Sequence, residues 1–157
     1  MKALLLIAFL LCTQQGLKAQ LINKMENNKR DSTAITEVLE NYYFKGIYEG
    51  NLDLLNQVYN TGTLLFGDVK GLPYAKTLDQ YVDGVNNRQS PKDSGKSFKG
   101  EIISIKLVNS IAIAEVKVKM YDFNYHEFLS FHKLNGKWLI VNKMITDIAN
   151  KFQNHMV

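Results

Sequence analysis

Several side chains in this sequence could perform acid–base chemistry on a small carbonyl compound. Carboxylates stand beside apolar strand-like segments at Asp68, Asp122 and Asp147, and phenol and imidazole groups are spread along the chain. Proton abstraction next to a carbonyl needs a carboxylate base with a hydroxyl or imidazole beside it in one apolar cavity. The question is whether the fold brings such groups together.

Asp68 is the candidate base, because it follows the apolar run "LLFG" and Gly67 would allow a close backbone approach. Tyr43 and His132 are the candidate hydroxyl and imidazole partners. A structural interpretation of Asp68 stays open, in which it is a turn residue before "VKG".

Metal and cofactor chemistry finds no support in the sequence. His126 and His132 share the parity of one strand but are six residues apart, roughly 20 Å at about 3.3 Å per residue, so they cannot ligate one ion. His155 lies near the chain end, and there is neither a cysteine pair nor a Gly-rich phosphate loop. We therefore predict no metal site and no cofactor.

The first 19 residues have the pattern of a secretory signal. Lys2 precedes an apolar run from Ala3 to Cys12, and Ala19 supplies the small residue at which signal peptidase would cut. The run is shorter than the roughly 18 residues that a membrane span needs. The alternative is a buried N-terminal strand or short helix. We expect residues 1–19 to be a signal peptide and the mature chain to be periplasmic or secreted, with no membrane span.

Removal of this segment leaves 138 of the 157 residues, a single-domain size. The only cysteine, Cys12, would be lost, so the mature chain would have no thiol nucleophile and no disulfide. Loss of Lys2 and Lys18 lowers the formal charge from +4 to +2, and the remaining lysines are dispersed. This composition argues against a nucleic-acid partner.

Helical periodicity comes first along the chain and strand periodicity last, which is typical of an α+β fold. We expect a flexible leader at 20–31, a domain at 32–150 and a tail at 151–157. Within the domain we expect a helix from Ser32 to Glu49 with Asp31 or Ser32 as N-cap, and a short helix capped by Asn51. A strand 63–69 follows, then a turn "KGLPYA", a third helix with a Thr77–Gln80 capping box and four alternating strands between 100 and 146.

The last two strands form a hairpin around Asn135–Gly136, the strongest short hairpin signal. Simple alternation places Trp138, Ile140, Asn142 and Met144 on one face of the last strand, and both of its faces are apolar. We therefore expect one face to cover the helices and the outer face to meet a second copy in a homodimer.

The segments "ENYYFKGIYEGNLDLL", "TLLFGDV" and "FLSFHKLNGKWLIVNKM" together resemble the NTF2-like superfamily, and within it the SnoaL-like and "putative lumazine-binding" group. The ending carries Lys133, Asn135, Gly136, Trp138 and Lys143 at the usual spacing, and the resemblance covers residues 33–148. It implies a cystatin-like α+β cone of three helices on a curved antiparallel sheet, with a pocket between them and dimerisation through the outer sheet face.

The resemblance implies an aromatic-lined pocket, for which the candidates are Tyr43, Phe66, Tyr81, Phe128 and Trp138, although each could be an ordinary core residue. Asn51 and the turn "NTGT" stand where relatives often carry titratable groups. This favours a non-catalytic domain that binds a small, partly apolar molecule. The alternatives are an isomerase, cyclase or dehydratase using Asp68, as ketosteroid isomerases of the superfamily use a pocket carboxylate, and a structural module without ligand.

Overall fold

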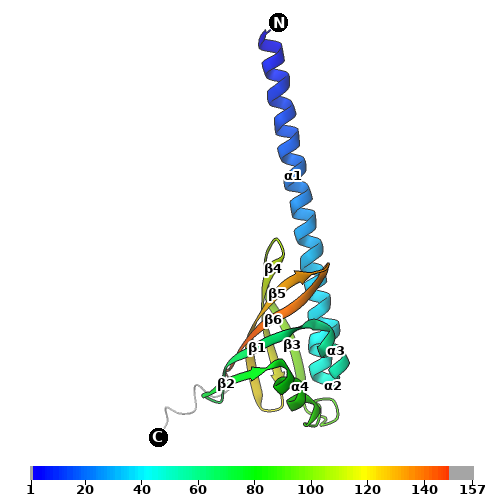
Figure 1. Cartoon of the computed structure of the whole chain (residues 1–157), viewed down its shortest axis with the longest axis vertical. Coiled ribbons are helices and arrows are strands. Elements are labelled where there is room, and N and C mark those ends of the chain that lie inside the picture. Colours follow the sequence, from blue (N-terminus) through cyan, green and yellow to red (C-terminus); the bar gives the residue numbers. More distant parts are fainter. Residues whose placement is uncertain (1, 149–157) are drawn as a thin grey trace. The chain divides into compact units, whose positions relative to one another are not determined.

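The structure is a computed structural model that describes the backbone of residues 2–148 and the side chains of residue 18 and residues 20–148. The predicted tail 151–157, His155 and the end of the predicted domain lie outside the described residues. The elements in chain order are α1 (Lys2–Val38), the π-helical turn η1 (Leu39–Phe44), α2 (Lys45–Glu49), α3 (Leu52–Val58), β1 (Tyr59–Val69), β2 (Leu72–Thr77), α4 (Leu78–Asn86), β3 (Phe98–Val108), β4 (Ile111–Met120), β5 (Phe123–Leu134) and β6 (Lys137–Asp147) (Figure 1).

The first helical segment starts earlier than predicted. Neither Asp31 nor Ser32 is an N-cap, because α1 is already helical from Lys2, and no Gly or Pro occurs between Gly16 and Gly46 to interrupt it. Residues 20–31, expected to form a leader, are helical with almost all side chains exposed. Within the described residues, no helix is long and apolar enough to cross a membrane.

From Ala34 onward the helices supply one side of the core. The buried stripe runs in steps of four residues through Ile35, Leu39, Tyr43 and Ile47, and the π-helical turn widens the helix at Tyr43. π-Helical turns within α-helices are frequent at functional sites. Tyr43 is therefore the tyrosine of this segment that is buried against the sheet.

The predicted caps of the later helices are confirmed. Gly50 has a left-handed φ of 65°, and the Asn51 side chain accepts a hydrogen bond from the Leu54 N–H at 3.2 Å. At the start of α4, Thr77 and Gln80 form the reciprocal capping box. Both helices therefore begin where the sequence predicted.

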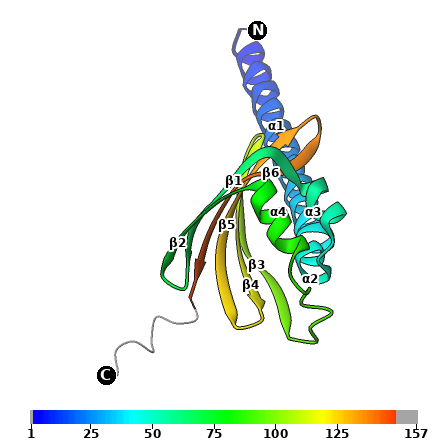
Figure 2. The ribbon, with the colours of Figure 1, turned by 60° about the horizontal axis from the view of Figure 1, so that its bottom comes forward.

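The six strands form one sheet in the order β2-β1-β6-β5-β4-β3. The sheet is mixed rather than purely antiparallel as predicted, because β1 pairs parallel to β6. Strand β2 replaces the predicted turn "KGLPYA"; it is an edge strand, where the missing N–H of Pro73 leaves no ladder bond unmade. Helices α2, α3 and α4 lie on one side of the sheet (Figure 2).

The predicted hairpin is confirmed, since Asn135 and Gly136 both have positive φ and join β5 to β6. The predicted alternation along β6 is wrong after Ile140. The register shifts there: Phe131 pairs with Ile140 but Ser130 pairs with Asn142, so Val141 is an extra residue. This bulge turns Lys143 and not Asn142 toward the helices.

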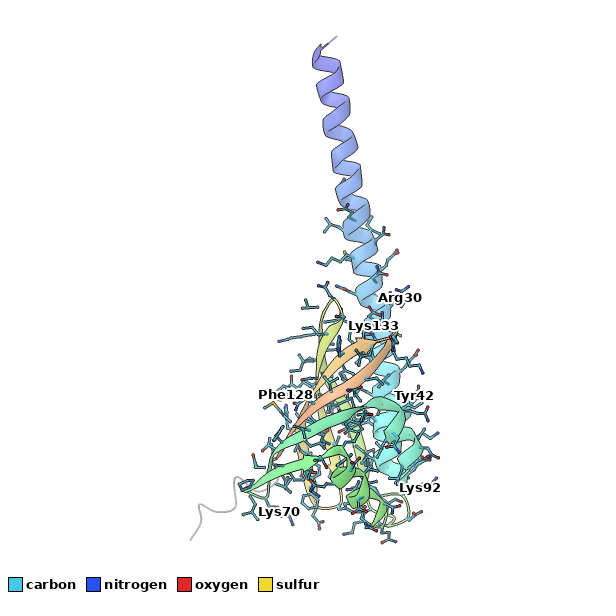
Figure 3. All side chains as sticks on the ribbon, in the orientation of Figure 1. Arg30, Tyr42, Lys70, Lys92, Phe128 and Lys133 are labelled. Carbon is cyan, nitrogen blue, oxygen red and sulfur yellow. The ribbon has the colours of Figure 1, made fainter. Side chains whose placement is uncertain are left out.

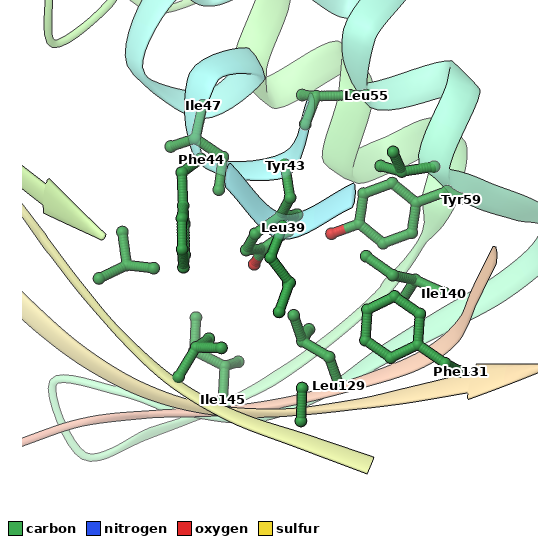
Figure 4. Close-up of a cluster of buried hydrophobic side chains, with 14 of the residues drawn as sticks. Leu39, Tyr43, Phe44, Ile47, Leu55, Tyr59, Leu129, Phe131, Ile140 and Ile145 are labelled. Atoms are coloured by element: carbon green, nitrogen blue, oxygen red, sulfur yellow. The ribbon is translucent and has the colours of Figure 1, made fainter. Parts of the chain in front are cut away.

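The core lies between the helices and the inner face of the sheet. Tyr43 and Leu39 extend from the first helical segment toward Leu129 and Phe131 of β5, and Tyr59 enters beside them (Figure 4). All five side chains are at most 4% exposed. The inner face is therefore packed mainly with apolar side chains, among which Glu127, Lys143 and Asp147 are buried charged residues.

Candidate functional site

A cavity of about 270 Å³ lies between α4 and the inner face of the sheet. Its walls are mainly aromatic and aliphatic, from residues including Val69, Tyr74, Tyr81, Val85, Val118, Phe123, Tyr125 and Ile145. Its charged lining residues are Lys76, Arg88, Glu127 and Lys143. Small-molecule sites commonly have about 300–1,000 Å³ and this mixture of apolar walls with a few polar groups, so the cavity suits a small ligand.

Three polar side chains form a closed network at the buried end of the site. Lys143 Nζ lies 2.7 Å from Glu127 Oε1 and donates a hydrogen bond to Tyr43 Oη at 2.7 Å. Tyr43 Oη in turn donates to Glu127 Oε2 at 2.5 Å. The side chains of Lys143 and Glu127 are 3% and 1% exposed. Each member thus satisfies the others, and almost no surface of the two charged side chains is exposed.

The electrostatics of the network fix its protonation states. Burial, followed by the nearby Glu127 carboxylate, raises the pKa of Tyr43 well above its usual value, so the phenol keeps its proton. Burial opposes the charge of Lys143, but Glu127 and the surrounding oxygens outweigh it, and the pKa of Lys143 is raised. At neutral pH the site therefore holds an ammonium group, which has no free electron pair for nucleophilic attack.

Two further tyrosines surround the ammonium group. Lys143 Nζ lies 5.3 Å and 5.2 Å from the ring centroids of Tyr43 and Tyr81, within cation–π range. Tyr59 Oη is buried and forms no hydrogen bond of normal geometry with any described residue. Burial and then Tyr81 and Glu127 raise the pKa of Tyr59 well above its usual value. The environment of the network is thus aromatic.

Arg88 contributes a second positive charge to the lining, from the segment that follows α4. Burial raises the pKa of Tyr74 and Tyr125, and the Arg88 guanidinium partly offsets that effect at both phenols. Arg88, Tyr74 and Tyr125 all line the cavity. Asp147, which also raises the pKa of Tyr125, is buried and accepts a hydrogen bond from the Asn124 N–H at 3.1 Å.

The structure does not bring the three predicted catalytic residues together. Val69 lines the cavity, and its strand neighbour Asp68 therefore points to the opposite, outer face of the sheet. There both carboxylate oxygens of Asp68 lie 3.0 Å from the hydroxyl of Thr146. His132 pairs with Ile111 and lines a hollow on that same outer face. Only Tyr43 belongs to the buried network, so Asp68 is not placed to act as a cavity base.

The predicted ligand-binding residues are also divided between the faces. Tyr81 lines the cavity, and Tyr43 lies directly behind Glu127 and Lys143. Phe66 and Phe128 are 45% and 39% exposed on the outer face, and Phe128 lies on the side of the sheet away from the helices (Figure 3). Trp138 is buried beside a separate groove near α3. Alternation alone could not tell these faces apart.

The remaining titratable candidates have structural positions. His126 Nε2 lies 2.9 Å from Glu115 Oε1 on the outer face, and Asp122 is exposed in the turn between β4 and β5. Within residues 18 and 20–148, no three His, Cys, Asp or Glu side chains converge as a metal site would require.

Sequence reasoning missed Glu127, Lys143 and Arg88. A signal for the first existed, because Glu127 shares its strand parity with the apolar Leu129 and Phe131, and a charge on an apolar face needs a buried partner. The bulge concealed the partner Lys143, and Arg88 lies in a polar segment with no periodic pattern.

Comparison with known proteins identifies the fold. A family model described as "Putative lumazine-binding" matches residues 30–146. The chain is similar to the crystal structure of an NTF-2 like protein of unknown function from Silicibacter pomeroyi DSS-3, with 18% identity over 76% of this chain and 98% of that one and a TM-score of 0.69.

Two further NTF2-like proteins of unknown function are also similar. The protein from Shewanella baltica OS155 has 23% identity, covers 75% of this chain and 94% of its own, and has a TM-score of 0.66. The protein from Methylobacillus flagellatus KT has 26% identity over 75% of this chain and 92% of its own, with a TM-score of 0.67. No curated protein matches the sequence. The fold is NTF2-like, as predicted.

Proposed function

This chain belongs to the family described as "Putative lumazine-binding", and from that premise we propose that its domain binds a small, partly apolar molecule in the cavity between α4 and the sheet. The observation that carries the proposal is an aromatic cavity of about 270 Å³ that ends on the Lys143–Glu127–Tyr43 network. Burial of an ion pair costs free energy that an apolar floor would not cost. A polar group at the end of an apolar cavity is instead the arrangement by which binding sites orient a ligand.

The same network supports binding rather than catalysis. Glu127 is held by Lys143 and Tyr43, and Lys143 stays protonated, so neither group is free to take a proton from a bound molecule. The network supplies fixed donors and a fixed charge without a base of suitable reactivity.

A substitution at Gly84 tests the proposal. Gly84 lines the cavity from α4, and a Cβ added there would meet only Lys76 Nζ, at 3.7 Å, so bulk can be introduced without strain. We would titrate the purified wild-type protein, Gly84→Phe and Gly84→Ala with indole by ¹H–¹⁵N NMR, and record native mass spectra of all three.

Indole should shift cavity resonances such as Val85 in the wild type and in Gly84→Ala, which adds only a methyl group. Gly84→Phe should abolish these shifts, together with any small molecule that the wild type retains in its native mass spectrum. Shifts that are the same in Gly84→Phe, or no shifts at the cavity and no retained mass in the wild type, would contradict ligand binding at this site.

We also propose that two copies associate through the outer face of the sheet. Large apolar side chains are exposed there. Among them are Phe66, Ile113, Phe128 and Met144, which are 39–54% exposed. Isolated exposed apolar residues are normal, but a contiguous group indicates an interaction surface. Sedimentation velocity of the purified protein would test this, with a monomer at micromolar concentration as the contrary result.

Export is proposed from the N-terminal sequence pattern alone. If residues 1–19 are a signal, the intact mass of protein secreted by an exporting host should correspond to a chain beginning at Gln20. An intact mass that retains Met1 to Ala19 would contradict this.

A further inference from the structure

Arg88 has hydrogen-bonding capacity that the protein itself does not use. Its Nε and Nη2 atoms are buried, and neither has a hydrogen-bond partner among the described residues. A buried donor without a partner lowers stability, and more so when the group is charged. Buried guanidinium groups therefore normally have acceptors, and this one lines the cavity.

The two unused nitrogens are the pair that a carboxylate needs. Nε–H and one N–H of Nη2 lie on the same edge of the planar guanidinium and point in parallel, so they can donate to the two oxygens of one carboxylate. An amide or alcohol offers only one acceptor along that edge. The geometry of the unsatisfied atoms thus matches a planar anion with two oxygens.

The segment around Arg88 is held in place. The Asn87 N–H donates to the Asp83 carbonyl at 3.0 Å at the end of α4, and the Tyr121 hydroxyl donates to the Gln89 carbonyl. Lys92 N–H donates to the Tyr48 carbonyl at 3.0 Å. Hydrogen bonds to the backbone on both sides therefore hold the segment that carries Arg88, while its Nε and Nη2 have no hydrogen-bond partner among the described residues.

The charge of the cavity also favours an anion. Its lining carries the cations Lys76, Arg88 and Lys143 and one carboxylate, Glu127, which already pairs with Lys143. The walls beside Arg88 are aromatic, with Phe123 and Tyr125 stacked at 5.2 Å between ring centroids.

We propose that the ligand is a small carboxylic acid whose apolar body lies between the aromatic walls and whose carboxylate pairs with Nε and Nη2 of Arg88 once that side chain turns, since neither atom is exposed to the cavity in this structure. This inference rests on the ligand-binding function proposed above and adds the chemical class of the ligand. A phosphate group could use the same two N–H groups, but the small, mainly apolar cavity favours the carboxylate.

The test is an NMR titration of the purified protein with benzoate, its neutral counterpart benzamide, and inorganic phosphate. Benzoate should bind at least tenfold more tightly than benzamide, and phosphate should not compete with it. Arg88→Gln should remove this preference, so that benzoate and benzamide bind with similar affinity. Arg88→Lys keeps the charge but loses the paired N–H groups, so it should lose most of the preference for benzoate over benzamide. Lys76→Gln should change the affinity for benzoate less than threefold.

A second measurement requires no ligand. If Arg88 serves the ligand rather than the fold, Arg88→Met should raise the thermal unfolding midpoint, because it removes a buried charged donor that lacks an acceptor. A lower midpoint would make Arg88 a structural residue and overturn the proposal. Equal affinity for benzoate and benzamide, including no binding of either, or phosphate binding equal to benzoate would also overturn it. Benzamide or indole binding without a benzoate preference would leave the proposed function standing and refute only the carboxylate.

Discussion

Glu127→Gln tests whether the buried network is held together by charge. The substitution keeps the shape of the side chain but removes the negative charge 2.7 Å from Lys143 Nζ, where both side chains are almost fully buried. We expect it to lower the free energy of unfolding by about 3–5 kcal/mol, because it leaves a buried ammonium group without a counter-charge.

The magnitude follows from two opposing terms. At an effective dielectric constant of about 20, opposite charges at this separation attract by roughly 6 kcal/mol. Desolvation of the two ions costs several kcal/mol each, so the intact pair roughly balances its own cost. Removal of Glu127 deletes the attraction and retains the desolvation cost of Lys143. Against a total stability of about 5–15 kcal/mol for a domain, this loss is large.

Urea unfolding followed by tryptophan fluorescence would measure the change. Trp138 is the only tryptophan and is 4% exposed, so its emission reports on the core. Glu101→Gln is the matched control, because Glu101 pairs with Lys99 at 2.8 Å on the surface, and its change should fall within experimental error. A Glu127→Leu/Lys143→Met double variant should recover most of the loss, since it removes both charges. A loss below about 1 kcal/mol in Glu127→Gln, or a double variant less stable than the single one, would refute the reasoning.

Three further predictions concern the tyrosines, the sheet and the outer face. The raised pKa of Tyr59 means that stability is complete below the usual tyrosine pKa of about 10 and falls as the pH rises further, because the unfolded phenol ionises first. In urea unfolding, Tyr59→Phe should reduce the fall in the free energy of unfolding between pH 10 and pH 11 by about 1 kcal/mol. Gly67→Ala should prevent stable folding, since the added Cβ would overlap the Ile145 carbonyl oxygen. Gly62→Ala, also at positive φ but in open space, should lower the free energy of unfolding by only about 1–3 kcal/mol. Circular dichroism melting curves that coincide for the two variants would contradict this. Phe128→Asp should convert the proposed dimer to a monomer in sedimentation velocity with an unchanged far-ultraviolet spectrum, and a persistent dimer would place the interface elsewhere.

Local signals predicted the fold well where one short segment decides the structure. The Asn135–Gly136 turn and the Thr77–Gln80 capping box depend only on residues a few positions apart, and both are as expected. The parallel pairing of β1 with β6 depends on segments about 80 residues apart, and no local pattern encodes it. Strand β2 was missed because Pro73 argues against a strand except at an edge, and the edge position follows only from the complete sheet order.

The site was harder to predict because it depends on one inserted residue. Val141 shifts the register of β6, and this reverses which side chains face the helices beyond Ile140. Tyr43 and Tyr81, candidates from the family resemblance, lie behind and at the cavity, but alternation along β6 could not pair Glu127 with Lys143. The predicted base, Asp68, stands near a turn, whereas the buried acid, Glu127, stands within strand β5.

The two positive groups of the cavity should act differently on a bound molecule. Lys143 is neutralised by Glu127 and hydrogen-bonded to Tyr43, so an approaching anion meets a pair with little net charge. Arg88 has two buried donors without a hydrogen-bond partner among the described residues. Replacement of the Lys143–Glu127 pair by apolar residues should therefore change stability and the shape of the cavity floor with little effect on the preference for carboxylates. Replacement of Arg88 should remove that preference without loss of stability, because specificity for charge requires a group that the fold itself has not already satisfied.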